Sequence, residues 1–337
     1  MNVDGSVHGQ TFVPTDVNTY TISPSSSLNF LTQGATDLTA ASFTQDSDPK
    51  GTLAWNTSSG LWMSPDGWFI CTSGTYAGDR LYGANLLGTA YDVSTQTYDW
   101  NDYQNMQNWS SGTPRSACVF NWTTDTGGSR SGGGGTKYMA YYDSGTYGFG
   151  LHTFTNTSSG NTWYTYDGSS TPSYSSSSTD YNSLENDGWG LHLDASNGRA
   201  FITGRQHNKM YALLNGSGAE ASTFPATFSN EFDISSQTTS SKDISLTEDG
   251  KFVIVCDDAS NVYGYELSSA WDLSTASYHG TFSTSAQTSD IAGCHISPDG
   301  NTVYILDNQY AAEYENFTFG YDVSGAASGT GRVAIFE

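Results

Sequence analysis

The sequence predicts an all-β fold, a closed β-propeller of four-stranded antiparallel blades. The first observation is a unit that occurs twice. Ile244–Cys256 and Cys294–Leu306 each contain two runs rich in β-branched and aromatic residues, joined by an Asp-Gly turn. The second is the spacing, because the turn glycines Gly250 and Gly300 lie 50 residues apart. The third is that one such period holds about four strand-like runs, the content of a propeller blade.

A second phrase follows these turns at a nearly constant distance. Trp271–Tyr278 reads Trp-Asp-Leu-Ser-Thr-Ala-Ser-Tyr and matches Tyr91–Tyr98, with a shorter match at Tyr321–Ser324. The aromatic residue of each phrase lies 22, 25 and 22 residues after the Asp of the preceding Asp-Gly turn. Because the residues of the phrase and its distance from the turn both recur, the repeat extends over much of the chain.

The repeat predicts a single domain, residues 1–337, most simply with five blades. A sixth blade stays open, since Gly67 and Gly198 lie 131 residues apart. Strand patterns at Leu38–Phe43 and Arg332–Phe336 suggest that the N-terminal segment completes the blade made by the C-terminal one, which hides the open sheet edges. After a lead-in over residues 1–51, the expected blades cover approximately 52–115, 116–183, 184–238, 239–287 and 288–337.

The composition is strongly acidic. The net charge is −23, with only 11 Lys and Arg among 337 residues. Such a field repels phosphates and anionic lipids, so we expect neither nucleic acid nor membrane insertion. No apolar run approaches the roughly 20 residues of a membrane span, and the first residues lack the pattern of a classical export signal.

Four cysteines, Cys71, Cys118, Cys256 and Cys294, each lie inside an apolar strand pattern without a close partner in sequence. Cysteine in such a setting behaves as a small hydrophobic residue. We therefore expect four buried, reduced thiols.

No local motif for catalysis or metal binding emerges. Asp66, Asp249 and Asp299 belong to Asp-Gly turns and lack the spacing of a calcium loop. His192 and His295 occupy equivalent repeat positions without neighbouring carboxylates, which indicates histidines packed between blades with one satisfied nitrogen. The sequence therefore predicts no catalytic residue, no metal, no cofactor, and a chain that is not an enzyme.

One aromatic segment does not fit the repeat. Trp100, Tyr103 and Trp109 lie among Asp, Asn and Gln residues without strand alternation. Aromatic faces beside amide and carboxylate groups suit contact with a protein or a glycan. The alternative, that these rings cap the adjacent blade, stays open.

The turns Ser64–Gly67 and Ser297–Gly300 resemble the broad SPDG/YVTN class of β-propeller repeats. The phrase Ser269–Tyr278 is similar to repeats in tail, fibre and other virion-associated proteins of bacteriophages and marine viruses. This resemblance implies a non-enzymatic structural component of a virus particle, such as a tail, fibre or capsid-decorating propeller. It would be located in the virion and bind other virion proteins and a host-surface glycan or receptor.

Two alternatives remain beside the virion interpretation: a secreted propeller enzyme acting on polysaccharide, and an extracellular carbohydrate-binding protein at the cell surface. An enzyme should place paired carboxylates or a His/Asp/Glu cluster at one mouth of the propeller channel. In the sequence the acidic residues fall mainly in turns and scattered loops, which favours the virion interpretation.

Overall fold

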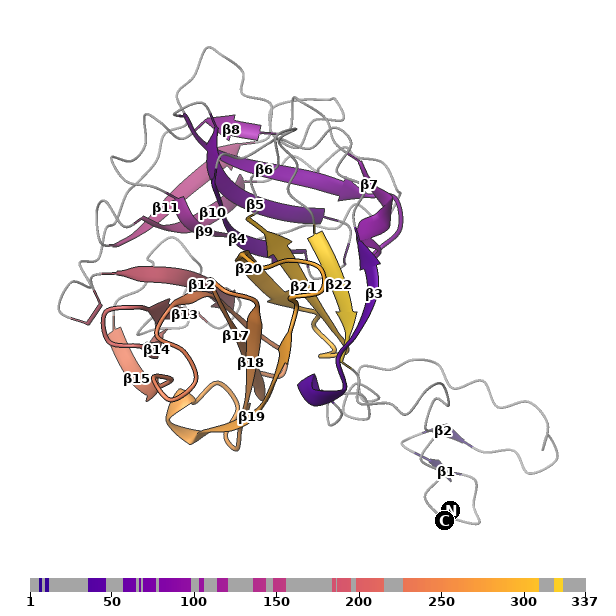
Figure 1. The fold of residues 1–337 in the computed structure, drawn as a ribbon, viewed down its shortest axis with the longest axis vertical. Coiled ribbons are helices and arrows are strands. Elements are labelled where there is room, and N and C mark those ends of the chain that lie inside the picture. Colours follow the sequence, from indigo (N-terminus) through magenta and orange to yellow (C-terminus); the bar gives the residue numbers. More distant parts are fainter. Residues whose placement is uncertain are drawn as a thin grey trace.

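The computed structural model describes residues 6–7, 10–11, 36–46, 57–64, 67, 69–76, 79–97, 103–105, 114–120, 136–143, 148–155, 184–185, 187–194, 198–214, 227–308 and 318–323. Its main elements are antiparallel strands, arranged in five sheets that follow one another in chain order (Figure 1). The all-β propeller prediction is confirmed: besides a two-stranded ladder, the described strands form five blade sheets, the predicted number. The assignment of the whole chain to one domain stays a prediction.

The first blade contains the most strands. Strands β4, β5, β6 and β7 pair in this order, and β8 pairs with β6. The second blade has three described strands, in the order β9, β10, β11. Their bounds are β4 Thr57–Met63, β5 Phe69–Tyr76, β6 Asp79–Leu87, β7 Gln96–Thr97, β8 Tyr103–Asn105, β9 Pro114–Phe120, β10 Thr136–Asp143 and β11 Gly148–Thr155.

Blades three to five each contain four strands, and a separate ladder joins β1 to β2. The last blade runs β20, β21, β22, β3. The bounds are β12 Gly188–Asp194, β13 Arg199–Gly204, β14 Lys209–Leu214, β15 Thr227–Asp233, β16 Ser241–Leu246, β17 Phe252–Asp257, β18 Asn261–Leu267, β19 Ala276–Ser283, β20 Ile291–Ile296, β21 Thr302–Asp307, β22 Thr318–Asp322, β3 Ser42–Asp46, β1 Ser6–Val7 and β2 Gln10–Thr11.

Strand β3 comes from the N-terminal part of the chain and completes the last blade. It pairs antiparallel with β22, with Phe43 opposite Tyr321 and Ser42 opposite Asp322, and the two strands lie side by side in Figure 1. The predicted pairing of N- and C-terminal segments is thus confirmed, although the strand it uses is β22. Arg332–Phe336 lies outside the described residues.

The first strand of each sheet lies on the inside, and these five strands contact one another as a ring. Strand β4 contacts β9, β9 contacts β12, and the contacts continue through β16 and β20 back to β4. Apolar clusters fill the space between neighbouring blades. One lies between blades four and five and includes Leu38 and Val323. Others lie between blades three and four and between blades five and one.

The repeated Asp-Gly turns have a local cause. Gly250 and Gly300 have φ of 65° and 73°, a conformation that favours glycine. Oδ1 of Asp249 accepts the Lys251 N–H at 3.0 Å, and Oδ1 of Asp299 accepts the Asn301 N–H at the same distance. These two aspartates serve the turns, as predicted, and Asp66 lies outside the described residues.

The aromatic phrase closes these turns from the outside. Trp271 and Tyr91 have positive φ, and their N–H groups donate to Gly250 and Gly67 O at 2.7 Å. Their rings lie so close to these glycines that no Cβ would fit there. Asp272 then caps a short 3-10 helix, η6 (Leu273–Thr275), which leads into β19. The repeated phrase therefore has a structural role in the blade: it packs on the Asp-Gly turn and leads into the last strand.

The predicted copy of the aromatic phrase at Tyr321–Ser324 is wrong. Tyr321 lies opposite Val303 as Tyr265 lies opposite Val253, so Tyr321 corresponds to Tyr265 and not to Trp271. The copy that serves the last blade comes instead from the N-terminal side. There the Thr36 hydroxyl donates to Gly300 O at 2.9 Å, and Asp37 caps η2 (Leu38–Ala40) just before β3.

Three of the cysteines, Cys71, Cys256 and Cys294, have buried free thiols, as expected. Cys118 lies in β9, and its side chain is outside the described residues. Within the described part of the chain, no helix is long and apolar enough to cross a membrane.

We expect Gly190→Ala and Gly293→Ala to destabilise the propeller by about 1–3 kcal/mol. A Cβ at Gly190 would lie 2.6 Å from Asp243 Cα, and one at Gly293 would lie 2.6 Å from Leu61 N, so backbone would have to move. Urea unfolding followed by circular dichroism measures the loss. Gly88→Ala is the control, because its Cβ would meet only Thr95 from 3.3 Å outward. Equal stability of all three variants would contradict this packing.

Candidate functional site

The carboxylate of Asp243 lies where the five inner strands meet. Its Oδ2 accepts the N–H groups of Leu61 at 3.0 Å and Cys294 at 3.2 Å. Its Oδ1 accepts the Ile244 N–H at 3.0 Å and faces the Ser116 hydroxyl at 3.4 Å. A further backbone hydrogen bond comes from Leu191. One side chain is thus bonded to all five blades.

The neighbouring inner strands carry small residues that let them approach this carboxylate. Besides the close approach of Gly190 to Asp243, a Cβ at Gly60 would lie 2.5 Å from Ser116 Cα, and one at Gly293 would lie 2.7 Å from Gly60 C. Only glycine or serine fits where the backbones come so near. Asp243 is therefore the one large side chain in a ring of small ones.

Burial raises the pKa of Asp243 to about 7, against the lowering effect of the backbone N–H groups of Leu61, Ile244, Cys294 and Leu191. The charge is costly there, and the four N–H donors offset only part of this cost. Both oxygens are used as acceptors, so the carboxylate serves as a structural joint and is not available to a ligand.

A layer of histidines lies on the turn side of Asp243. His192 Nδ1 accepts the Leu246 N–H at 3.3 Å, and His295 Nδ1 lies 3.4 Å from the Ser245 hydroxyl. Burial lowers the pKa of His192 to about 4 and that of His295 to about 3. As predicted, these histidines are packed between blades and satisfied at one nitrogen.

The other side of Asp243 faces the mouth, the end of the propeller at which the inner strands begin and the second strands end. Here three cations surround the ring of Trp189. The guanidinium carbon of Arg115 lies 3.7 Å from the ring centroid, that of Arg205 4.1 Å, and Nζ of Lys242 4.2 Å. These four residues form what we call the mouth cluster.

Lys242 reaches this place because of an irregularity in its strand. The pairing of β16 with β17 shifts between Ser241 and Asp243, so Lys242 is the extra residue of a β-bulge. Bulges redirect side chains and are frequent beside functional sites. The side chain is only 9% exposed. Desolvation, followed by the charge of Arg205, lowers its pKa below the usual value.

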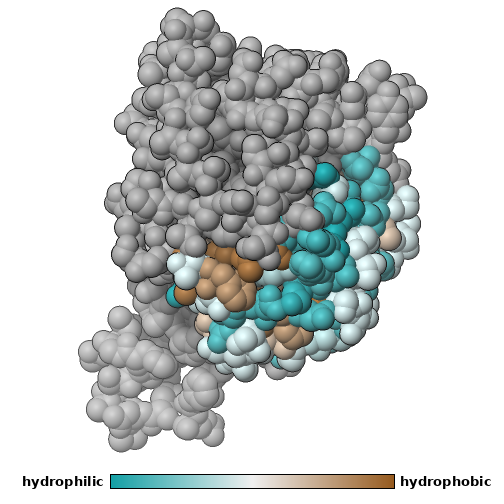
Figure 2. Space-filling view, turned by 90° about the vertical axis from the view of Figure 1, so that its left-hand side faces the viewer, coloured by the Kyte–Doolittle hydropathy of each residue, from teal (hydrophilic) through white to brown (hydrophobic). Residues whose placement is uncertain are grey.

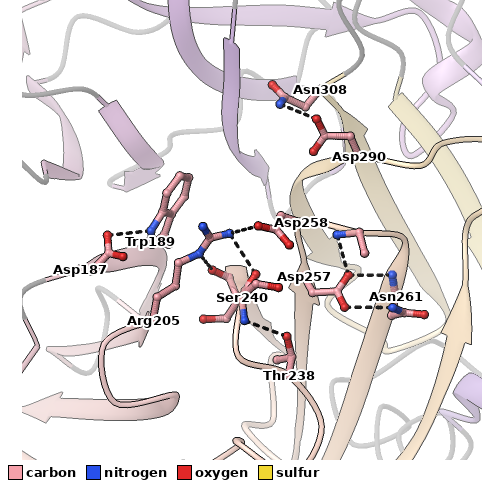
Figure 3. A network of polar contacts seen from close by, with 12 residues as sticks. Asp187, Trp189, Arg205, Thr238, Ser240, Asp257, Asp258, Asn261, Asp290 and Asn308 are labelled. Carbon is pink, nitrogen blue, oxygen red and sulfur yellow. Dashed lines mark hydrogen bonds and ion pairs between the residues drawn. The ribbon is translucent and has the colours of Figure 1, made fainter.

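Arg205 is held from several sides. Its Nε donates to Ser241 O at 2.9 Å, and its Nη2 donates to Ser240 O at 3.1 Å and to the carboxylate of Asp258 at 2.8 Å (Figure 3). The indole N–H of Trp189 donates to Asp187 at 2.9 Å. The network therefore fixes the stacked pair of Arg205 and Trp189.

Further polar groups belong to the same rim. Asp290 accepts from the amide of Asn308 at 2.9 Å in blade five (Figure 3). Buried Glu185 accepts the N–H groups of Asp187, Gln206 and His207. On the face drawn in Figure 2, hydrophilic described residues lie beside a smaller hydrophobic patch.

Sequence reasoning missed the mouth cluster, because its members come from three blades and lie up to 127 residues apart. Two signals could have pointed to it. Trp189 and Lys242 lie at the same repeat position, directly before Gly190 and Asp243. The chain also has only 11 Lys and Arg residues, and three of them, Arg115, Arg205 and Lys242, belong to the cluster.

The residues predicted to bind a partner lie elsewhere. Tyr103 begins β8, opposite Gly83 of β6, and its side chain is not described. Trp100 and Trp109 lie outside the described residues, so contact through this segment stays a prediction. Among the described residues no group of His, Cys, Asp and Glu could hold a metal ion.

The chain matches no protein-family model and no curated protein. Solved structures are similar at low identity. The calcium-binding protein regucalcin from Agrobacterium tumefaciens C58 is 7% identical, with a TM-score of 0.43 over 84% of this chain and 96% of that one. A candidate gluconolactonase is 10% identical, with a TM-score of 0.40 over 83% and 92%. A candidate 6-phosphogluconolactonase from Bacteroides uniformis is 14% identical, with a TM-score of 0.37 over 78% and 71%.

These likenesses concern the propeller fold alone, but they correct one prediction. The expectation that the chain is not an enzyme is wrong as drawn, since solved structures of this fold carry the names of enzymes. The physical reason is that a propeller gathers side chains from several blades at its mouth. The absence of a local sequence motif therefore excludes nothing, and Arg115, Arg205 and Lys242 illustrate such a gathering.

Asp243→Asn should destabilise the fold by roughly 1–3 kcal/mol for each buried N–H that loses its acceptor. Either orientation of the new amide turns its NH₂ toward at least one N–H donor now bonded to Asp243. Thermal and urea unfolding measure the effect. Asp249→Asn is the control, because an amide oxygen can still accept the Lys251 N–H in that turn. A mild effect at Asp243 would show that the centre is not held by this carboxylate.

Stability should fall as the pH is lowered from about 6.5 to 5. His192 and His295 have folded pKa values of about 4 and about 3 against a usual 6.5, so the unfolded chain takes up their protons first. Asp243 acts in the opposite sense, because its raised pKa makes the fold less stable as the pH rises toward about 7. Each group contributes about 1.4 kcal/mol per pH unit. The two histidines therefore outweigh the one aspartate.

Unfolding midpoints measured between pH 5 and 6.5 test this balance. In the double variant His192→Asn/His295→Asn only the aspartate contribution remains, so the slope of stability against pH should reverse. An unchanged slope would mean that neither histidine is held neutral in the folded chain.

Proposed function

We propose that this chain is a carbohydrate-acting β-propeller whose ligand binds at the mouth. The observation that carries the proposal is a convergence of polar side chains from three consecutive blades at the same rim. Figure 3 shows Arg205, Asp258, Asp290 and Asn308 there, and the charges of Arg205, Asp258 and Asp290 act on Lys242.

This set combines hydrogen-bond donors and acceptors in fixed orientations. Asp258 and Asp290 offer carboxylate oxygens to hydroxyl groups, whereas Lys242, Arg205 and Asn308 offer N–H donors. Sugars present closely spaced hydroxyls that need both kinds of partner. A few well-placed polar groups at the mouth of a rigid scaffold are typical of ligand sites.

Lys242 offers N–H donors to a bound ligand from a partly desolvated position, and this desolvation lowers the pKa of its ammonium. Asp258, whose side chain is 39% exposed, lies within the same network and can reach a bound molecule.

The virion location and the binding of other virion proteins remain predictions. They rest on the repeat phrase Trp271–Tyr278, and in the fold this phrase has a structural task at the Asp-Gly turn. No contact described in the propeller adds to them, so the mouth supports the carbohydrate proposal more directly.

Incubation with a panel of polysaccharides and oligosaccharides tests the proposal. We expect binding by isothermal titration calorimetry and new reducing ends or unsaturated sugars with at least one substrate. Asp258→Asn should reduce turnover at least tenfold, while Asp272→Asn, a half-buried cap at the opposite end of the blade, should not. Failure of every glycan to bind, with the fold intact by circular dichroism, would overturn the proposal.

A further inference from the structure

We infer that the mouth cluster is an oxyanion site, and that the ligand is an acidic sugar whose carboxylate, sulfate or phosphate binds Lys242 beside the arginines of the cluster. The inference rests on the proposed function for its sugar part. Its anion part is carried by the described contacts alone.

The first step is the concentration of positive charge. Three of the 11 basic residues of a chain with net charge −23 lie within 4.2 Å of one indole centroid. An indole face attracts cations but neutralises none of their charge. Trp189 therefore holds three cations near one another without providing an anion.

The second step is that Lys242 has no bonded anion among the described residues. No hydrogen bond or ion pair with a described residue reaches its Nζ, although the residue as a whole is only 9% exposed. A partly desolvated ammonium gains from pairing with an anion. The contacts it does have, the Trp189 ring and the repelling charge of Arg205, include no anion.

The third step concerns the nearby carboxylates, which are engaged elsewhere. Asp258 is bonded to Arg205, Asp290 to Asn308, Asp187 to the Trp189 indole, and Glu185 to backbone N–H groups. Asp258 and Asp290 act on Lys242 only through their field. They remain free to accept hydroxyl protons on their other lone pairs, which favours a ligand with both an anionic group and hydroxyls.

A purely structural lysine would behave differently on substitution. Lys242→Met keeps the length and packing of the side chain and removes a desolvated charge. If the ammonium serves a ligand, this variant should be more stable than the parent and should bind the acidic ligand at least tenfold more weakly. If it serves the fold, the variant should be less stable. Lys251→Met, at an exposed turn beyond the far end of β16, is the matched control.

A series of ligands that differ in charge tests whether the negative charge of the sugar is needed for binding. We would titrate the full chain with a galacturonic acid oligomer, its methyl ester and a galactose oligomer of equal length. Inorganic sulfate and phosphate are the probes without a sugar. The expected result is binding of the acidic oligomer, at least tenfold weaker binding of the ester and the neutral oligomer, and loss of the acidic binding in Lys242→Met only.

The outcomes separate the two proposals. Equal binding of acidic and neutral oligomers would overturn the oxyanion site and leave the carbohydrate function standing. Binding of sulfate or phosphate that depends on Lys242, without binding of any oligomer, would support the oxyanion site and overturn the carbohydrate function. Lower stability of Lys242→Met, or equal loss in Lys251→Met, would also overturn the inference.

Discussion

The buried carboxylate of Asp243 is the constraint on which the rest of the structure depends. A five-bladed ring brings its inner strands so close together that most of their backbones meet at glycine or serine. Such an arrangement leaves N–H groups at the centre that face no strand partner, and buried donors need acceptors. One aspartate supplies acceptors to several blades at once, and the bulge that precedes it turns Lys242 toward the mouth. The same local geometry therefore closes the centre and shapes the candidate site.

Local signals in the sequence predicted the fold well. Asp-Gly turns, apolar alternation and a repeat of about 50 residues depend on contacts within one hairpin, so they are visible in a short window. The place of each histidine followed from the same register. The false copy at Tyr321 shows the limit of this reasoning: an aromatic-Asp pair fits the third strand as well as the cap, and only the pairing with Val303 distinguishes them.

The candidate site could not be predicted in the same way. Arg115, Trp189 and Lys242 approach one another only because three inner strands adjoin around the axis, and nothing within one repeat encodes that distance. The inference against catalysis failed for the same reason, since it looked for neighbours in sequence where the fold supplies neighbours in space. Asp243 was equally hidden, because its role requires donors from five separate strands.

The completion of the last blade by β3 has a consequence for how the chain is made. Residues 42–46 leave the ribosome long before residues 318–322, so the edge that β3 will cover does not exist for most of synthesis. The four-stranded sheets of blades three and four are built from consecutive segments and can form during synthesis. The ring can close only after β22 has been synthesised. Until then Phe43 and the cap at Asp37 remain without their site, and that interval is when a nascent chain of this kind most needs protection from pairing with another copy.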